Sequence, residues 1–163
     1  RTALCAPRRC CAAAGKAAGY FAVIRNPSPD EMAATHAAAF DGHGWPASDF
    51  AKYLDDTTVL VHGTNLSFVV LRLAGPEAEV LTLASRPDCQ GHGLATRNLE
   101  RALRIVTHKG VQEVFLEVAD DNAPALALYA RCGFVEFSRR HNYYKSGATA
   151  ICMKAQLSQG PSA

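Results

Sequence analysis

The chain has 163 residues, of which 48% are hydrophobic and 20% charged, a composition typical of one globular domain. No stretch approaches the roughly 18 consecutive apolar residues that span a bilayer, which excludes an integral membrane protein. The formal net charge of +2 is unevenly distributed: residues 1–19 hold four basic and no acidic side chains, and the remainder holds 13 basic and 15 acidic ones. This slightly acidic body argues against general nucleic-acid binding.

Residues 1–19 are alanine-rich and could be an extension, a targeting peptide or a phosphate-binding arm. They contain no serine, unlike most transit peptides, so we favour an extension without function, followed by a domain over 20–157 and a tail over 158–163. The adjacent Cys10 and Cys11 have no second pair at ligand spacing, so no metal site is predicted. Because no secretory hydrophobic region is evident, we expect reduced thiols and a cytoplasmic protein.

The first elements of the body are a short strand and two helices. An apolar run over 20–25 predicts the strand. The sequence Ser28-Pro-Asp-Glu31 predicts a helix start, because serine is a favoured N-cap, proline fits the first helical position and acids suit the positive end of the helix dipole. This helix should extend to about Phe40. A second short helix follows Trp45, with Ser48 as its candidate cap.

The remaining elements alternate between strands and helices. Apolar, β-branched runs over 57–62 and 67–73 predict a hairpin, and a long helix over about 93–107 follows from leucine and valine at helical spacing. Further strands are predicted over 78–85, 111–118, 134–144 and 149–157, with a helix from Asp121 or Asn122 to Ala130. One βαβ crossover among antiparallel hairpins predicts a mixed α/β fold.

The loop over 85–96 is the most informative stretch. Gly91 and Gly93 let the backbone turn its N–H groups toward one point, and the following helix adds unpaired donors and partial positive charge. These features predict a pyrophosphate site, although a plain strand–helix turn would use glycine in the same way. Neither a dinucleotide-binding Gly-x-Gly-x-x-Gly nor a Gly-Lys-Ser/Thr P-loop is present.

The segment Gln90-Gly-His-Gly-Leu-Ala95 resembles the Q/R-x-x-G-x-G/A motif of Gcn5-related N-acetyltransferases (GNAT), which hold the pyrophosphate of acetyl-CoA with it. Other segments that resemble this family are 81–87, 116–118 and 122–134, and those that resemble its RimI-type branch, which acetylates the N-terminal alanine of a ribosomal protein, are 45–46 and 139–144. The resemblance covers roughly residues 20–155. It implies a mostly antiparallel sheet splayed between the fourth and fifth strands, with helices on both faces.

The resemblance also implies an acetyl-CoA-dependent N-acetyltransferase in which an amine attacks the acetyl carbon directly. Glu117, near the end of an apolar strand, corresponds to the family's proton acceptor, and Tyr129 is the candidate acid for the departing thiolate. Neither Cys89 nor Cys132 is expected to be a nucleophile, because no His–acid pairing accompanies them.

The implied binding residues fall in three groups. The pantetheine arm is expected along the backbone of Leu83, Ala84 and Ser85, where a free N–H could hold the oxyanion. The pyrophosphate is expected at Gly91, His92, Gly93, Leu94, Ala95 and Thr96, with Asn122 as both a helix cap and a coenzyme contact. The acceptor peptide is expected at Trp45, Tyr143 and Tyr144. The branch commonly has arginines where Gly91 and His92 stand, so Arg97 or Arg101 is a candidate replacement.

Several functions remain open for this chain. The leading one is acetylation of a protein N-terminal α-amine. The alternatives are acetylation of a lysine or small-molecule amine, a non-catalytic acyl-CoA sensor and a nucleotide-binding regulator. Glu117 together with Tyr129 argues against a sensor, which needs neither residue. No direct nucleic-acid partner and no membrane partner is expected.

Overall fold

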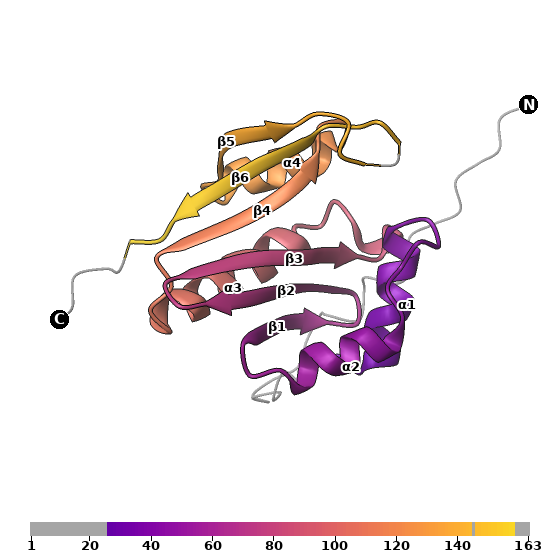
Figure 1. Cartoon of the computed structure of the whole chain (residues 1–163). Coiled ribbons are helices and arrows are strands. Elements are labelled where there is room, and N and C mark those ends of the chain that lie inside the picture. Colours follow the sequence, from indigo (N-terminus) through magenta and orange to yellow (C-terminus); the bar gives the residue numbers. More distant parts are fainter. Residues whose placement is uncertain (1–25, 145, 159–163) are drawn as a thin grey trace, which may run out of the picture.

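The computed structural model describes residues 26–144 and 146–158. One six-stranded sheet has the order β1-β2-β3-β4-β6-β5, and every neighbouring pair is antiparallel except the parallel pair β3 and β4 (Figure 1). The strands are β1 (Val59–Thr64), β2 (Ser67–Ala74), β3 (Glu77–Ser85), β4 (Glu113–Ala119), β5 (Val135–Arg140) and β6 (Ala150–Gln156). The helices are α1 (Pro29–Ala39), α2 (Ala47–Asp55), α3 (Leu94–His108) and α4 (Ala123–Arg131). The predicted mixed α/β fold is confirmed; the extension over 1–19 and the strand expected over 20–25 lie outside the described residues.

Strands β3 and β4 are neighbours along only a short stretch. Their Cα partners are limited to Glu77–Glu79 on β3 and Glu113–Phe115 on β4. β3 then continues to Ser85 and β4 to Ala119 without pairing with each other, and Figure 1 shows the two strands diverging toward their C-terminal ends. This divergence confirms the predicted splay.

An extra residue in β3 decides which side chains face α3. Two consecutive residues of β2 pair with Val80 and Thr82, so Leu81 is the additional residue of a β-bulge. Val80, before the bulge, packs in the core beneath α3, and so does Leu83 beyond it. Strict alternation would send Leu83 to the opposite face. The bulge therefore turns the last part of β3, including Ser85, toward the α3 side of the sheet.

Helices cover both faces of the sheet, as predicted. Successive residues of β2 point to opposite faces: Val69 packs in a core cluster with α3, whereas Phe68 packs in a second cluster with α1 and α2. Helix α4 lies on the α3 face, where Tyr129 joins the first cluster. The short connection between α3 and β4 begins at Lys109-Gly110, as the sequence indicates.

Two of the three predicted N-caps of the helices are confirmed. Ser28 and Glu31 form a reciprocal capping box at the start of α1. Asn122, not Asp121, caps α4. The prediction of Ser48 as the cap of α2 is wrong, because Pro46 is the N-cap residue and Ser48 already lies within the helix. The proline ring fixes φ at a value that suits the entry to a helix. Pro46 therefore precedes α2 without a side-chain hydrogen bond to the helix.

The last hairpin is shorter than predicted. The sequence predicts a strand over 134–144, but β5 ends at Arg140 and a turn follows in which Asn142 has a φ of 54°. This left-handed backbone cannot continue a strand, and asparagine tolerates it better than most residues. Tyr143 and Tyr144 therefore lie in the loop between β5 and β6.

Candidate active site

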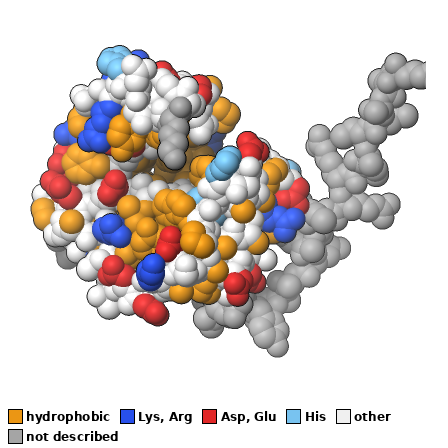
Figure 2. Space-filling view, turned by 45° about the vertical axis from the view of Figure 1, so that its right-hand side comes forward, with side chains coloured by type: hydrophobic (Ala, Val, Ile, Leu, Met, Phe, Trp, Pro, Cys, Tyr) orange, Lys and Arg blue, Asp and Glu red, His pale blue; other side chains and the backbone are white. Residues whose placement is uncertain are grey.

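A cavity of about 650 Å³ opens on the side of the sheet that α3 and α4 cover. Its walls come from the end of β3, the loop after it, the first turn of α3 and one side of α4. Figure 2 shows the surface hollowed near its centre, with hydrophobic side chains around the hollow. The lining residues that the sequence predicts are Leu83, Ser85, Gly91, Gly93, Leu94, Ala95, Thr96, Asn122 and Tyr129. Three separate stretches of the chain, 39–40, 83–96 and 122–131, thus converge on one site.

Two glycines shape the loop between β3 and α3. Gly91 and Gly93 have φ values of 76° and 72°, which glycine adopts without steric penalty. His92 does not line the cavity; its Nδ1–H donates to the Gln90 carbonyl at 2.9 Å. Gln90 in turn donates from Nε2 to the Ser85 carbonyl at 3.2 Å. The polar side chains of the loop thus brace its own backbone.

The N-terminus of α3 has backbone donors without side-chain partners. Its N-cap residue is Gly93, which supplies no capping side chain, and its first turn holds no acidic residue. At α4, by contrast, Asn122 Oδ1 accepts the Ala125 N–H at 3.2 Å. The first N–H groups of a helix have no intrahelical acceptor, so those of Leu94–Thr96 are available to an anion in the cavity.

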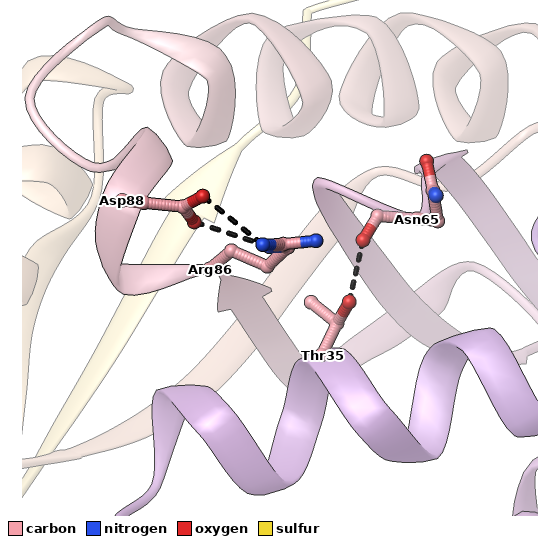
Figure 3. Close-up of polar contacts among 4 residues, drawn as sticks. All are labelled: Thr35, Asn65, Arg86 and Asp88. Atoms are coloured by element: carbon pink, nitrogen blue, oxygen red, sulfur yellow. Dashed lines mark hydrogen bonds and ion pairs between the residues drawn. The ribbon is translucent and has the colours of Figure 1, made fainter. Parts of the chain in front are cut away.

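A corner of polar contacts fixes the entry to this loop (Figure 3). Arg86 donates from Nε and Nη2 to the two oxygens of Asp88 at 3.1 and 3.0 Å, and its backbone N–H donates to the Leu66 carbonyl at 2.9 Å. Beside it, Thr35 Oγ1 of α1 donates to the Asn65 carbonyl. The loop entry, the β1–β2 turn and α1 are therefore tied together.

Tyr129 stands at the inner end of this cavity's α4 wall. Its side chain is 8% exposed and packs edge-on against Phe134, with ring centres 5.8 Å apart. Burial, followed by smaller contributions from Cys132 and Tyr144, raises the pKa of Tyr129 to about 12. Its hydroxyl has no hydrogen-bond partner among the described residues. The phenol is thus protonated at neutral pH and can donate to a ligand.

Glu117 lies on the opposite face of the sheet. On β4 it alternates with Leu116 and Val118, which are buried toward α3 and α4, so its carboxylate points the other way. There it lines a second cavity of about 240 Å³. The two predicted catalytic residues, Glu117 and Tyr129, therefore do not share one cavity. The two cavities lie on opposite faces of the sheet, and the gap between the unpaired parts of β3 and β4 lies between them.

Among the described residues, Arg140 is the charged partner of the Glu117 carboxylate. Arg140 Nη1 lies 2.7 Å from Oε1, and the Cys152 thiol lies 3.9 Å from the same oxygen. Oε2 accepts no hydrogen bond from the described residues. Burial, and next the Glu117 carboxylate, raise the pKa of both the Tyr144 phenol and the Cys152 thiol.

The predicted acceptor residues divide between two places. The Arg140 guanidinium lies 5.6 Å from the ring centre of Tyr143, which packs edge-on against Tyr144 at 5.3 Å. This pair of tyrosines therefore lies beside Glu117, as a shared acceptor site requires. Trp45 lines neither cavity; it stacks on His36, with ring centres 4.9 Å apart.

A buried histidine holds the segment that carries Trp45. The Trp45 N–H donates to His36 Nδ1 at 3.1 Å, so Nε2 carries the ring proton and donates to Thr82 Oγ1 on β3 at 3.0 Å. Burial lowers the pKa of His36 to about 4, so the ring is neutral at neutral pH. The α1–α2 loop is thereby anchored to β3 through one side chain.

The sequence does not predict several residues of the larger cavity, and two of them have large side chains. Phe40, at the end of α1, and Arg131, at the end of α4, both line it. Helical spacing could have revealed Arg131, which lies three residues beyond Leu128 on the same side of α4. The suggested Arg97 and Arg101 do not line the cavity: Arg97 Nη1 lies 3.5 Å from where a Cβ on Gly93 would stand, and Arg101 influences His62 on β1.

Metal-ligand clusters and membrane-spanning helices are absent from the described part of the chain. No group of three or more His, Cys, Asp or Glu side chains within residues 26–144 and 146–158 could hold a metal ion. No helix in those ranges has the length and apolar character needed to cross a membrane. The cysteines described there, Cys89, Cys132 and Cys152, are not joined by disulfides.

Comparisons with known proteins agree with this geometry. The family model described as acetyltransferase (GNAT) family matches residues 15–134. N-alpha-acetyltransferase 30 of Schizosaccharomyces pombe is 34% identical over 109 residues, covering 67% of this chain and 71% of that protein. The ribosomal protein bS18-alanine N-acetyltransferase of Escherichia coli K12 is 36% identical over 83 residues, covering 51% of this chain and 56% of that enzyme.

Solved structures extend these matches over most of the fold. The ribosomal-protein-S18-alanine N-acetyltransferase from Escherichia coli superposes with a TM-score of 0.72 at 28% identity, covering 81% of this chain and 89% of that one. A chain of the NatC complex bound to Gag peptide and CoA has a TM-score of 0.69 at 18% identity, covering 80% and 91% of the two chains. The second likeness concerns the fold alone.

Proposed function

The chain belongs to the acetyltransferase (GNAT) family, and from this premise we propose that it transfers the acetyl group of acetyl-CoA to the α-amine of a protein N-terminus. One observation carries the proposal: a single cavity joins the uncapped start of α3 to the open edge of β3 and the hydroxyl of Tyr129. A long coenzyme with an anionic end and a reactive thioester end fits such a cavity. The names of the Schizosaccharomyces pombe and Escherichia coli relatives support the choice of acceptor.

In the proposed complex, the pyrophosphate of acetyl-CoA accepts hydrogen bonds from the backbone of Gly91–Thr96. The uncapped amides and the positive end of the α3 dipole favour an anion there without any basic side chain in the loop. The pantetheine arm lies along Leu83–Ser85, whose outer edge β4 leaves unpaired. Asn122 contributes from the start of α4, where its side chain already caps the helix.

Glu117 is the proposed general base. An alkyl ammonium does not attack a thioester, so the acceptor amine must first lose a proton, directly or through water. Arg140 occupies Oε1 of this carboxylate, which leaves Oε2 to take the proton. The amine nitrogen then attacks the acetyl carbon through the gap between β3 and β4, the C–N bond forms and the C–S bond breaks.

Tyr129 is the proposed donor to the sulfur that departs. With a pKa of about 12 its phenol stays protonated at every physiological pH, so it can always hydrogen-bond a thiolate. A phenol this weakly acidic suits stabilisation of the thiolate charge better than complete proton transfer before the C–S bond breaks. The nitrogen loses its second proton as the amide forms, and the sulfur receives one proton, from Tyr129 or from water, and leaves as the free thiol of CoA.

The acceptor is proposed to approach from the face that carries Glu117. Tyr143 and Tyr144, in the β5–β6 loop, lie beside the base and offer aromatic surface and hydroxyl groups to a peptide backbone. The smaller cavity, with Phe115 and Phe137 in its wall, would take the first side chain of the acceptor. Its volume of about 240 Å³ admits the methyl side chain of alanine, the residue named for the Escherichia coli relative, as well as larger side chains.

An acetylation assay tests this proposal. Purified protein with acetyl-CoA should acetylate an alanine-starting peptide, and mass spectrometry should place the acetyl group on the α-amine. The same peptide with a blocked N-terminus and an internal lysine tests side-chain acetylation, and a panel of small amines tests the remaining alternative. Turnover confined to lysine or to small amines would refute the proposed acceptor.

Substitution of Glu117 tests the proposed base. Glu117→Gln removes the proton acceptor but keeps the shape, so the turnover rate should fall by about a hundredfold or more while acetyl-CoA affinity is retained. Glu113→Gln is the matched control, because Glu113 lies on the same face of β4 and bonds Lys154 at 3.1 Å. An undiminished rate in Glu117→Gln would show that the base lies elsewhere.

A further inference from the structure

Arg131 is the only charged side chain among the described residues that line the larger cavity. It makes no hydrogen bond or ion pair with any of the described residues, in contrast to Arg86, Arg139 and Arg140, which pair with carboxylates. It is also exposed. An exposed guanidinium on a cavity wall, without a protein partner, is available to an anionic ligand.

Arg131 lies at the end of α4 and is not part of the loop over 85–96. It is the last residue of α4, and Asn122, which begins that helix, lies about 13 Å away along the axis. Burial is the main cause that raises the pKa of the neighbouring Cys132 thiol. The charges of Glu100, on the second turn of α3, and of Arg131 also influence that pKa, so both lie near the thiol. Arg131 therefore lines the part of the cavity wall that lies farthest along α4 from Asn122.

The proposed coenzyme carries two separate anionic groups. The uncapped amides of Leu94–Thr96 can serve its pyrophosphate, but they cannot also serve the phosphate on the ribose 3′-oxygen. Arginine offers planar paired donors that match phosphate oxygens, and such charge-assisted contacts are among the stronger hydrogen bonds. Building on the proposed function, we propose that Arg131 binds the 3′-phosphate of the coenzyme and selects for coenzymes that carry it.

Isothermal titration calorimetry with two coenzymes tests this assignment. Wild-type protein should bind acetyl-CoA about tenfold or more tightly than 3′-dephospho-acetyl-CoA, the difference expected for one charge-assisted contact. Arg131→Gln should bind both coenzymes equally, and at the affinity that the wild type shows for the dephosphorylated one. Arg131→Lys, which keeps the charge without the paired donors, should retain part of the preference.

Arg104→Gln is the matched control, because Arg104 is another exposed helix arginine, on α3, whose side chain does not line the cavity. It removes the same charge and should leave the preference intact. Thermal unfolding of both variants checks that each is folded, since Arg131 also suits the negative end of the α4 dipole.

Three outcomes would overturn the assignment. A wild-type protein that binds both coenzymes equally has no 3′-phosphate contact. An Arg131→Gln variant that keeps the wild-type preference places that contact elsewhere. A variant weakened equally for both coenzymes assigns Arg131 to the pyrophosphate. Failure of the wild type to bind either coenzyme would instead refute the proposed function.

Discussion

At the scale of single residues, Tyr129 combines a buried ring with a hydroxyl that lacks a protein partner. Tyr129→Phe removes only that oxygen, so the ring should still pack on Phe134 and the fold should be preserved. Without the hydrogen bond to the departing thiolate, the turnover rate should fall by about a hundredfold, with little change in acetyl-CoA affinity. Steady-state kinetics and calorimetry measure the two quantities separately.

Tyr53→Phe is the control for this substitution, because Tyr53 is a half-buried tyrosine in the cluster beneath α1 and α2, away from both cavities. Its rate should match that of the wild type. If Tyr129→Phe retained full turnover, the thiolate would have to be stabilised by another donor.

The residue scale also shows what a sequence can reveal about a site. Glu117 alternates with apolar residues along its strand, a pattern that already places it on the face away from Val118. The spacing from Asn122 to Tyr129 places these two on one side of a helix, as the cavity confirms. What spacing cannot reveal is the ion pair between Glu117 and Arg140, because it depends on how β6 sets β5 relative to β4.

At the scale of elements, His36 couples α1, the α1–α2 loop and β3. Because burial lowers its pKa from 6.5 to about 4, folding is opposed by protonation of this ring. Relative to the protonated ring, the neutral ring contributes at most about 3 kcal/mol to the free energy of unfolding. This contribution is complete above pH 6.5 and should be lost as the pH falls toward 4. Urea unfolding at several pH values should therefore give a smaller acid-induced loss of stability for His36→Gln than for the wild type.

The pH dependence of the variant must be compared with that of the wild type, because burial also lowers the pKa of His62. His108→Gln, at an exposed position on α3, is the control and should keep the wild-type pH dependence. Parallel pH profiles for His36→Gln and the wild type would contradict the assigned role of His36.

Element boundaries were predictable where local chemistry decides them. The capping box at Ser28 and Glu31 needs only four consecutive residues, and it marks the start of α1 correctly. The bulge at Leu81 depends on pairing with β2, a distant segment, and nothing in the sequence around it departs from an ordinary strand. The residue type of Ser48 suits an N-cap, but Pro46 is the residue at which the chain enters α2.

At the scale of the whole molecule, the splayed sheet implies a specific pattern of protection by ligand. Acetyl-CoA should slow amide hydrogen exchange along Leu83–Ser85 and Gly91–Thr96, since both segments would donate backbone hydrogen bonds to it. The β1–β2 hairpin, whose strands are paired along their whole length, is the internal control. Exchange measured by mass spectrometry should therefore change on one side of the molecule only. Equal protection of these two segments and of the β1–β2 hairpin would argue against the proposed site.

The overall architecture was the most predictable level, because it follows from the order of the elements and one crossover. The sequence predicts helices on both faces and a divergence between two strands, and both are confirmed. It does not predict that the proposed base and the proposed thiolate donor stand on opposite faces of the sheet. That arrangement requires knowing how far β3 and β4 remain paired, which only the folded register reveals.

The short pairing of β3 with β4 also has a consequence for how the protein behaves without ligand. A sheet normally has two outer edges, but here the two strands diverge after three residue pairs and create two more edges in its interior. Unpaired strand edges attract other chains, and proteins usually protect them. Along β3 the pantetheine arm would serve as that protection, in the place of a missing strand. If the proposed coenzyme occupies this edge, the empty protein should self-associate more readily than the coenzyme-bound form, so bound coenzyme would also reduce aggregation.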